Sequence, residues 1–280
     1  MKLETFFTSI ADKVRELLGI TDKIKPKNFV NKLTEIFNAG KKSAYDEFWD
    51  KYQQNGNRTD YYCAFSGRGW TTDNFKPKYD IIVDGDAADS EIHLFDRCEI
   101  NGSLKQILEN QGVELKFQNL GAIIRMTRLF YNNSGLTELP VIDFSTATIR
   151  ENYPSDLNNL SYTVSWNTKV ETIEKFIFPT QTIFAGNPTN RGSIFNYFRA
   201  LKNIDFEGTC RFSLGFGQSP LLTPQSILNI FNHLSTEEFT KARVIYINKT
   251  AKENYNAVYN DWDTKVAYYS TNGNWTFSIV

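Results

Sequence analysis

The sequence predicts a mixed α/β protein in which an N-terminal helical segment precedes a body of short, stacked strand-and-turn repeats. Apolar residues recur at helical spacing over the first 52 residues, whereas from about residue 88 they alternate in short runs that end in similar tripeptides. Aromatic residues make up 15% of the chain, and Phe alone contributes 22. A core rich in Phe and Ile favours strands and stacked turns over a helix bundle.

Two amphipathic helices are expected within residues 1–56. The first carries an apolar stripe from Phe7 to Leu18 and should stop at Gly19. The second carries a stripe from Phe29 to Tyr52, which Gly40 should interrupt. One alternative is a helical hairpin packed within its own domain. The other is a docking or self-association segment, since two helices of this size cannot bury both stripes alone. The second alternative predicts a homo-oligomer.

The rest of the chain divides into three expected segments. Residues 57–87 form a β-rich connector with strands at Asp60–Phe65 and Tyr79–Val83. Residues 88–248 form the repeat body. Residues 249–280 form a C-terminal cap, because an open stack of repeats needs a terminal unit to protect its core.

Each repeat combines a short helical turn, a Leu-x-x-Leu/Ile step and an alternating strand that ends in Ile-Asp-Phe or a similar tripeptide. The clearest copies span residues 126–144 and 193–206, with a degenerate copy at 170–178. Equivalent apolar positions lie 34 and then 28 residues apart, against roughly 20–29 in leucine-rich repeats, so insertions are expected. A unit of this size buries its apolar side only against neighbours. The body is therefore predicted to be a leucine-rich-repeat-like solenoid with irregular repeats, and an irregular α/β domain is the alternative.

A ladder of such strands buries one side and leaves the alternating residues as one continuous surface. Leu139, Ile173 and Ile204 are expected to point into the core. The surface set is polar and somewhat acidic, which fits hydroxyl-rich or basic partners better than phosphate. Its members are Asn203, Asp205, Glu207, Thr172, Glu174 and Arg243. In the competing interpretation the strands are a scaffold, and inserts at 145–169 and 179–192 bind the partner.

Sequence patterns for catalysis and metal binding are sparse. The sequence has only two histidines and contains no G-x-S-x-G, H-E-x-x-H or Walker motif. His233 is expected to cap a helix C-terminus, and His93 to face solvent. Asp84, Asp86 and Asp89 lack the ligand spacing and terminal Glu of a calcium loop, so a solvated turn is expected. We expect no catalytic residues, no metal site and no cofactor. Glycosidase carboxylates stay open as the alternative, because sequence does not show their separation.

Charge and cysteine usage narrow the partners and the compartment. A net charge of −1 gives no long-range attraction for nucleic acid or anionic lipid, so neither partner is expected. Cys63, Cys98 and Cys210 are sparse and form no CxxC pair, which favours a reduced protein without disulfides. Glu4 and Asp12 interrupt the apolar run that a signal peptide needs, and no stretch is apolar enough to enter a membrane. Cytoplasmic synthesis without a signal peptide is expected.

Two N-terminal stretches carry a family resemblance. AGKKSAYDEFWDKYQQNGNRTD at 39–60 and GWTTDNFKPKYD at 69–80 resemble the N-terminal module of a family encoded by phages and prophages of gut Firmicutes. The copy at 126–144 is similar to the BspA-like leucine-rich repeats of that family, and residues 219–228 and 273–277 are similar to its chain ends. The resemblance implies a tail-associated appendage with no catalytic residues to transfer.

These expectations combine into a non-enzymatic structural or binding protein. It would be made in a bacterial cytoplasm and carried in the virion, in contact with phage tail or baseplate components. Its recognition surface would face a bacterial surface polysaccharide or protein. The alternative function is a cell-wall or capsule glycan hydrolase of a phage appendage.

Overall fold

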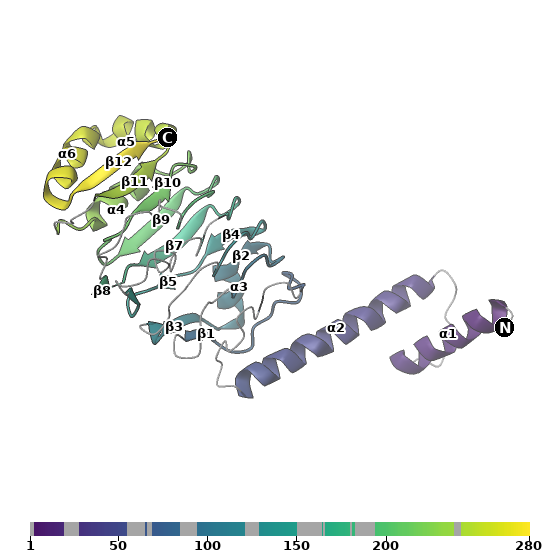
Figure 1. Ribbon diagram of the computed structural model, residues 1–280. Coiled ribbons are helices and arrows are strands. Elements are labelled where there is room, and N and C mark those ends of the chain that lie inside the picture. The colour runs from purple at the N-terminus through teal and green to yellow at the C-terminus, as the bar shows by residue number, and fades with distance from the viewer. Residues whose placement is uncertain are drawn as a thin grey trace. The chain divides into compact units, whose positions relative to one another are not determined.

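The computed structural model is a mixed α/β structure whose described strands all pair in parallel (Figure 1). The chain divides into two compact units, Met1–Gln54 and Asn55–Val280. No helix in the described part of the chain has both the length and the apolar character of a membrane span. The described residues are 3–19, 28–54, 65, 69–84, 94–120, 129–149, 164, 166–179, 181–182, 194–237 and 242–280.

The first unit consists of α1 (Leu3–Leu18) and α2 (Phe29–Gln54). Gly19 ends α1 with a φ of 61°, as the sequence predicted. The predicted second helix is confirmed, and α2 runs without a break through Gly40, where only the apolar stripe is interrupted. One glycine costs a helix only about 1 kcal/mol relative to alanine, which a 26-residue helix tolerates.

The second unit begins with residues that were expected to form a separate connector. In the described part of that segment, Thr71 bridges to Glu99 and the Phe65 amide donates to the Leu94 carbonyl at 3.1 Å. The expected strand near Tyr79 is present as β1 (Ile81–Asp84), which pairs with β3 (Leu115–Gln118). These residues are therefore hydrogen-bonded to the repeat body. The strand expected at Asp60–Phe65 lies outside the described residues except for Phe65, which is in a turn.

The predicted repeats lie side by side in one parallel sheet (Figure 1). Glu138 pairs with Thr172, 34 residues later, and Thr172 pairs with Asn203, 31 residues later. Leu139, Ile173 and Ile204 are buried, which confirms their predicted place in the core. The strands of the sheet are β2 (Gly102–Ser103), β4 (Leu136–Leu139), β5 (Ile142–Asp143), β7 (Thr172–Ile177) and β9 (Asn203–Glu207).

A break separates β4 from β5 at Pro140 and Val141, although both strands pair with β7. Proline has no N–H to donate to a ladder, so a break at this position is expected physically. Strand β7 shifts register against β9 between Ile173 and Phe176. A further short pair, β6 (Thr148–Ile149) with β8 (Gln181–Thr182), continues the same parallel order.

Buried phenylalanine rings stack on one another in two groups. The rings of Phe65, Phe95 and Phe130 stack in sequence at centroid distances of 5.0 and 5.1 Å, and Phe195 stacks on Phe216 at 4.8 Å. All five side chains are buried. Offset aromatic pairs contribute about 0.5–1.5 kcal/mol beyond the area they bury. The high Phe content of the sequence is thus used to connect one repeat to the next.

The turns before β2, β4, β7 and β9 each contain a non-glycine residue with positive φ: Arg97 (56°), Asn132 (57°), Trp166 (64°) and Tyr197 (64°). This conformation costs roughly 1–2 kcal/mol for most side chains. At two of these positions the rings stack on each other, because Trp166 and Tyr197 lie 3.9 Å apart between centroids. That stacking offsets part of the backbone cost.

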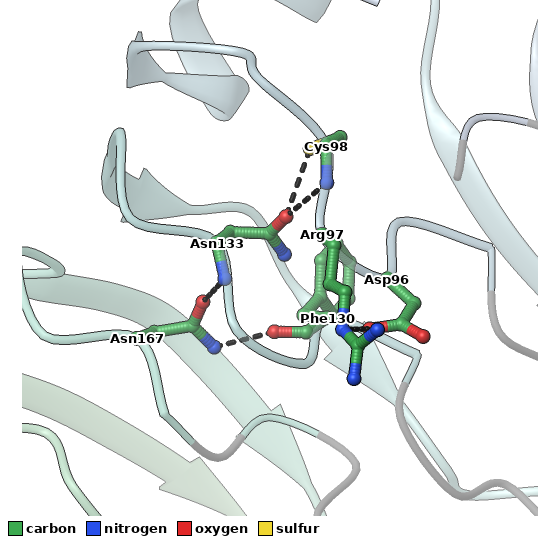
Figure 2. A network of polar contacts seen from close by, with 6 residues as sticks. All are labelled: Asp96, Arg97, Cys98, Phe130, Asn133 and Asn167. Atoms are coloured by element: carbon green, nitrogen blue, oxygen red, sulfur yellow. Dashed lines mark hydrogen bonds and ion pairs between the residues drawn. The ribbon is translucent and has the colours of Figure 1, made fainter. Parts of the chain in front are cut away.

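Buried amides link the same turns, as Figure 2 shows. Asn133 Oδ1 accepts from the Cys98 amide and thiol, both at 2.9 Å. Asn167 Oδ1 accepts from the backbone N–H of Asn133 at 3.0 Å. Its Nδ2 donates to the backbone carbonyls of Phe130 and Val164 at 2.5 and 2.7 Å. Backbone groups in a turn lack a ladder partner, so these side chains supply one inside the core.

Helices alternate with the strands of a second parallel sheet toward the C-terminus. The hydroxyl of Ser226 accepts from the Ile204 amide at 3.1 Å, and the Thr223 amide donates to the Lys202 carbonyl at 2.9 Å. The start of α4 therefore lies along the edge of β9. Thr223 caps α4 and Pro224 is its first residue, two residue types that favour a helix start at these positions. The elements are β10 (Leu214–Phe216), α4 (Pro224–His233), β11 (Arg243–Ile247), α5 (Lys249–Tyr259), α6 (Trp262–Gly273) and β12 (Trp275–Ile279).

Replacing Asn167 with alanine should lower the free energy of unfolding by about 2–4 kcal/mol, because it leaves one amide and two carbonyls without their buried partner. Urea denaturation of the full chain, followed by circular dichroism, measures the loss. Asn254→Ala is the matched control, since Asn254 is exposed on α5, and it should change stability by less than about 0.5 kcal/mol. Equal midpoints for the two variants would show that the network does not hold the turns together.

Candidate binding face

The exposed side of the parallel sheet gathers polar side chains from four successive strands. Strand β9 alternates exposed and buried residues over its whole length. Half-exposed Thr172 of β7 lies beside exposed Asn203 of β9, and half-exposed Glu138 of β4 lies beside Thr172. This alternation follows from the two-residue period of a strand packed on one side only. We define the outer face as Ser103, Glu138, Thr172, Glu174, Asn203, Asp205 and Glu207.

Five of the six residues predicted for a binding surface lie together here. Thr172 and Glu174 are half-exposed on β7, with Thr172 paired directly to Asn203. Asn203, Asp205 and Glu207 are exposed on β9. Their predicted position on one surface is confirmed, and their role in binding stays a prediction.

Arg243 does not belong to this face, so its predicted exposure is wrong. It is only 4% exposed, and its Nε donates to the Arg211 carbonyl at 3.2 Å. Strand β11 belongs to the separate β10–β11–β12 sheet, where Val244 and Tyr246 are the half-exposed residues. The sequence prediction placed Arg243 on the exposed side of β11 because arginine is a polar residue. In the structure the alkyl stem of Arg243 and its hydrogen-bonded guanidinium group are buried. Burial lowers the pKa of Arg243.

Two lysines form ion pairs with carboxylates of the outer face. Lys105 lies 3.0 Å from Glu174, and Lys175 lies 2.9 Å from Glu207. Hydrogen bonds to these glutamates raise the pKa of both lysines. Such exposed pairs contribute about 0–1 kcal/mol each. They position the side chains more than they stabilise the fold.

Neutral polar side chains also make hydrogen bonds to residues at both ends of the face. The Ser103 hydroxyl donates to Glu138 Oε2 at 2.6 Å, and Asn229 Nδ2 donates to Asp205 Oδ1 at 3.2 Å. The Thr223 hydroxyl lies 3.4 Å from the Asn203 side-chain oxygen. The face is therefore bounded by helix-associated residues on both sides.

The sequence analysis missed α3 (Leu104–Gln111) and with it Ser103 and Lys105. Ser103 caps this helix by accepting from the Gln106 amide, and Gly112 ends it with a φ of 66°. A serine, an apolar pair at helical spacing and a following glycine were therefore a usable signal. Lys175 was also missed, because strict alternation does not allow for the register shift in β7.

The other candidates have structural roles where they are described. Asp84 is buried and accepts from Gln118 Nε2 at 2.8 Å and Asn119 Nδ2 at 3.2 Å, so the solvated turn predicted for it is wrong. His233 Nδ1 lies 2.7 Å from the Gly208 carbonyl oxygen, a contact to another segment and not the expected helix cap. Asp86, Asp89 and His93 lie outside the described residues.

Both described cysteines are buried and free of disulfides. Burial raises the pKa of the Cys98 thiol to about 11 and that of Cys210 to about 12, so both are protonated at neutral pH. Cys63 lies outside the described residues. Within the described ranges, no three His, Cys, Asp or Glu side chains are grouped to hold a metal ion.

The expected inserts can be compared with the structure only in part. Residues 150–163 and 183–193 lie outside the described residues. No family model, curated protein or solved structure matches the chain. The geometry of the outer face is therefore the basis on which a function is assigned.

Replacing Arg243 with alanine should reduce the free energy of unfolding by about 1–3 kcal/mol, since it removes a buried hydrogen bond and the packing of the alkyl stem. It should leave the outer face unchanged. Thermal denaturation of Arg243→Ala measures the effect against Arg199→Ala, a substitution at an exposed arginine. Unchanged stability in Arg243→Ala would contradict its assignment to the core.

Proposed function

We propose that the chain is a non-enzymatic binding protein whose Asn55–Val280 unit is a leucine-rich-repeat-like solenoid. In this proposal it is a tail-associated appendage of a phage or prophage virion, and its outer face binds a partner on the bacterial surface. The observation that carries the proposal is the row Glu138, Thr172 and Asn203, in which equivalent polar residues of successive repeats lie opposite one another. A row of this kind presents one extended polar surface rather than a single enclosed site.

Three repeated features support the solenoid. Strands 31–34 residues apart pair in parallel, phenylalanine rings stack from turn to turn, and left-handed residues recur in the turns. Each feature needs the neighbouring repeat to be present, as expected for units that do not bury a core alone. An irregular α/β domain would have no reason to repeat all three.

The chemistry of the face suits a partner rich in hydroxyl groups. Amide and carboxylate side chains such as Asn203, Asp205 and Glu207 accept hydrogen bonds in several directions, and Asn203 also donates. The lysines are engaged by glutamates, which disfavours a phosphate-bearing partner. A bacterial surface polysaccharide is the partner class that this surface fits best, ahead of a surface protein.

Replacing Glu174, Asn203 and Asp205 together with alanine should weaken binding to capsule or cell-wall preparations about tenfold or more, because several hydrogen bonds to the partner are lost. The melting temperature should stay nearly constant, since these side chains are partly or fully exposed. Sedimentation of labelled protein with insoluble glycan gives the affinity. Glu253, Asn254 and Asp263, all exposed on C-terminal helices, form the matched control set.

Two outcomes would contradict the proposal. Binding that survives the triple change but disappears when residues 180–190 are replaced would assign recognition to the inserts. Release of soluble fragments from the glycan, abolished by one carboxylate substitution, would favour the alternative glycan hydrolase.

An exposed apolar stripe on α2 supports self-association of the first unit. Val30, Leu33 and Phe37 are 69%, 42% and 62% exposed, and their spacing places them along one side of the helix. The three- and four-residue steps match the seam of a coiled coil. We therefore place a homo-oligomer contact on this stripe.

Substituting Val30, Leu33 and Phe37 with serine should shift the full chain toward the monomer, because the apolar contact between copies is removed. Light scattering after size-exclusion chromatography gives the mass. Alanine substitutions at Asn31, Thr34 and Asn38, which are exposed on the same helix, should leave the mass unchanged. A monomeric unsubstituted chain would exclude self-association through this stripe.

A further inference from the structure

Aromatic side chains of three successive turns form a row that is separate from the outer face. The ring of Trp166 stacks on Tyr197 of the next turn at a centroid distance of 3.9 Å, and Tyr131 of the preceding turn lies 6.2 Å from Trp166. Trp166 is 37% exposed, and the two tyrosines are half-exposed. Unlike the buried phenylalanine rings, this row therefore lies at the surface.

The backbone of these turns does not itself require an aromatic residue. Trp166 and Tyr197 both have a φ of 64°, a left-handed conformation that is unfavourable for bulky side chains. The corresponding residue of the preceding turn is Asn132, with a φ of 57°, and asparagine tolerates this conformation. The chain thus holds two exposed rings where asparagine fits with less strain. Strained residues of this kind concentrate at ligand-binding sites.

Two cations accompany the stacked rings. Lys169 lies on the first of the two stacked turns and Arg199 on the second, and both are exposed. Within the part of the chain that the structure describes, neither side chain forms an ion pair or a hydrogen bond. The lysines that accompany the outer face are different, since they are bonded to its glutamates. The sequence has no carboxylate at 166–170 or 194–200, so both positive charges remain available to a partner.

We infer that the turn cluster, defined as Tyr131, Trp166, Lys169, Tyr197 and Arg199, binds carboxylate-bearing sugars of a polysaccharide. The C–H groups of a sugar ring leave water against aromatic surface, while an ammonium and a guanidinium group bind the carboxylate. The inference rests on the proposed function and specifies its sugar class.

One extended ligand can reach both surfaces. The rings lie on successive turns, and the strands that follow these turns carry the paired outer-face residues Thr172 and Asn203. The aromatic row and the row of polar residues therefore run from repeat to repeat in the same direction. A polysaccharide along this direction places carboxylates at the turn cluster and hydroxyl groups at the outer face.

The surrounding charges favour an acidic polysaccharide over nucleic acid. A nucleic acid is charged at every nucleotide and depends on many cations for its affinity, whereas the cluster offers two and the whole chain has a net charge of −1. Glu171, the next carboxylate after Lys169, is bonded to Lys202 at 2.7 Å, which reduces its repulsion of an incoming anion. The cluster therefore suits a sugar chain whose carboxylates are separated by neutral rings.

The test measures binding of hyaluronan oligosaccharides to the full chain by isothermal titration calorimetry. Hyaluronan carries a carboxylate on every second sugar, and its methyl ester is a neutral match with the same sugars and linkages. The acid should bind at least about threefold more tightly than the ester, because the ester forms no ion pair with Lys169 or Arg199. Equal affinities would overturn the role of the cations, and equally tight binding of poly-L-glutamate would overturn the assignment to a sugar.

The ring variant is Trp166→Asn with Tyr197→Asn, in which each new residue matches the one that the preceding turn already has at Asn132. It should weaken hyaluronan binding at least about threefold, because the aromatic contacts are lost. Tyr268→Asn is the control, since Tyr268 is another tyrosine that is 52% exposed, and it should leave the affinity unchanged. A ring variant that lowers only the melting temperature and keeps its affinity would show that the rings serve the fold alone.

The charge variant, Lys169→Gln with Arg199→Gln, decides the question even if the ring variant does not fold. It should weaken hyaluronan binding at least about threefold, whereas Lys76→Gln with Lys249→Gln, at other exposed lysines, should not. If hyaluronan does not bind while the chain still binds bacterial glycan through the outer face, this inference fails and the proposed function stands. Hyaluronan binding that depends on the turn cluster, without glycan binding through the outer face, would have the opposite meaning.

Discussion

Parallel pairing between strands one repeat apart is the constraint on which the Asn55–Val280 unit depends. A strand of two to six residues with one turn holds too little apolar surface to form a core, so its buried side exists only because the next repeat covers it. Backbone groups set the same requirement. Turn amides such as that of Asn133 find their partner one repeat later, in Asn167. Packing and hydrogen bonding thus both set the register of each strand against its neighbour.

The arrangement of the outer face follows from that register. Because Ile173 pairs with Ile204 and both are buried, the preceding residues Thr172 and Asn203 lie opposite each other on the exposed side. The break at Pro140 and Val141 is a departure from this regularity, since it separates β4 from β5 while both strands still pair with β7.

The sequence was sufficient to predict most of what depends on local periodicity, although the short helix α3 was missed. The core positions Leu139, Ile173 and Ile204, the cap of α4 at Thr223 and the strand near Val244 all follow from residue type and spacing. The failures arise where a distant segment decides the environment. Arg243 is buried because β11 joins a second sheet, and Asp84 is buried because Gln118 of β3 and the following Asn119 bond to it.

The hydroxyl of Ser226 bonds to backbone groups at the start of β9, where the parallel sheet has an edge. A free edge strand is a template onto which another chain can add its own strand, and it is a common starting point for aggregation. Because the first turn of α4 bonds the Lys202 carbonyl and the Ile204 amide, the start of the β9 edge is covered within the molecule. A strand added by another copy would find these backbone groups already bonded.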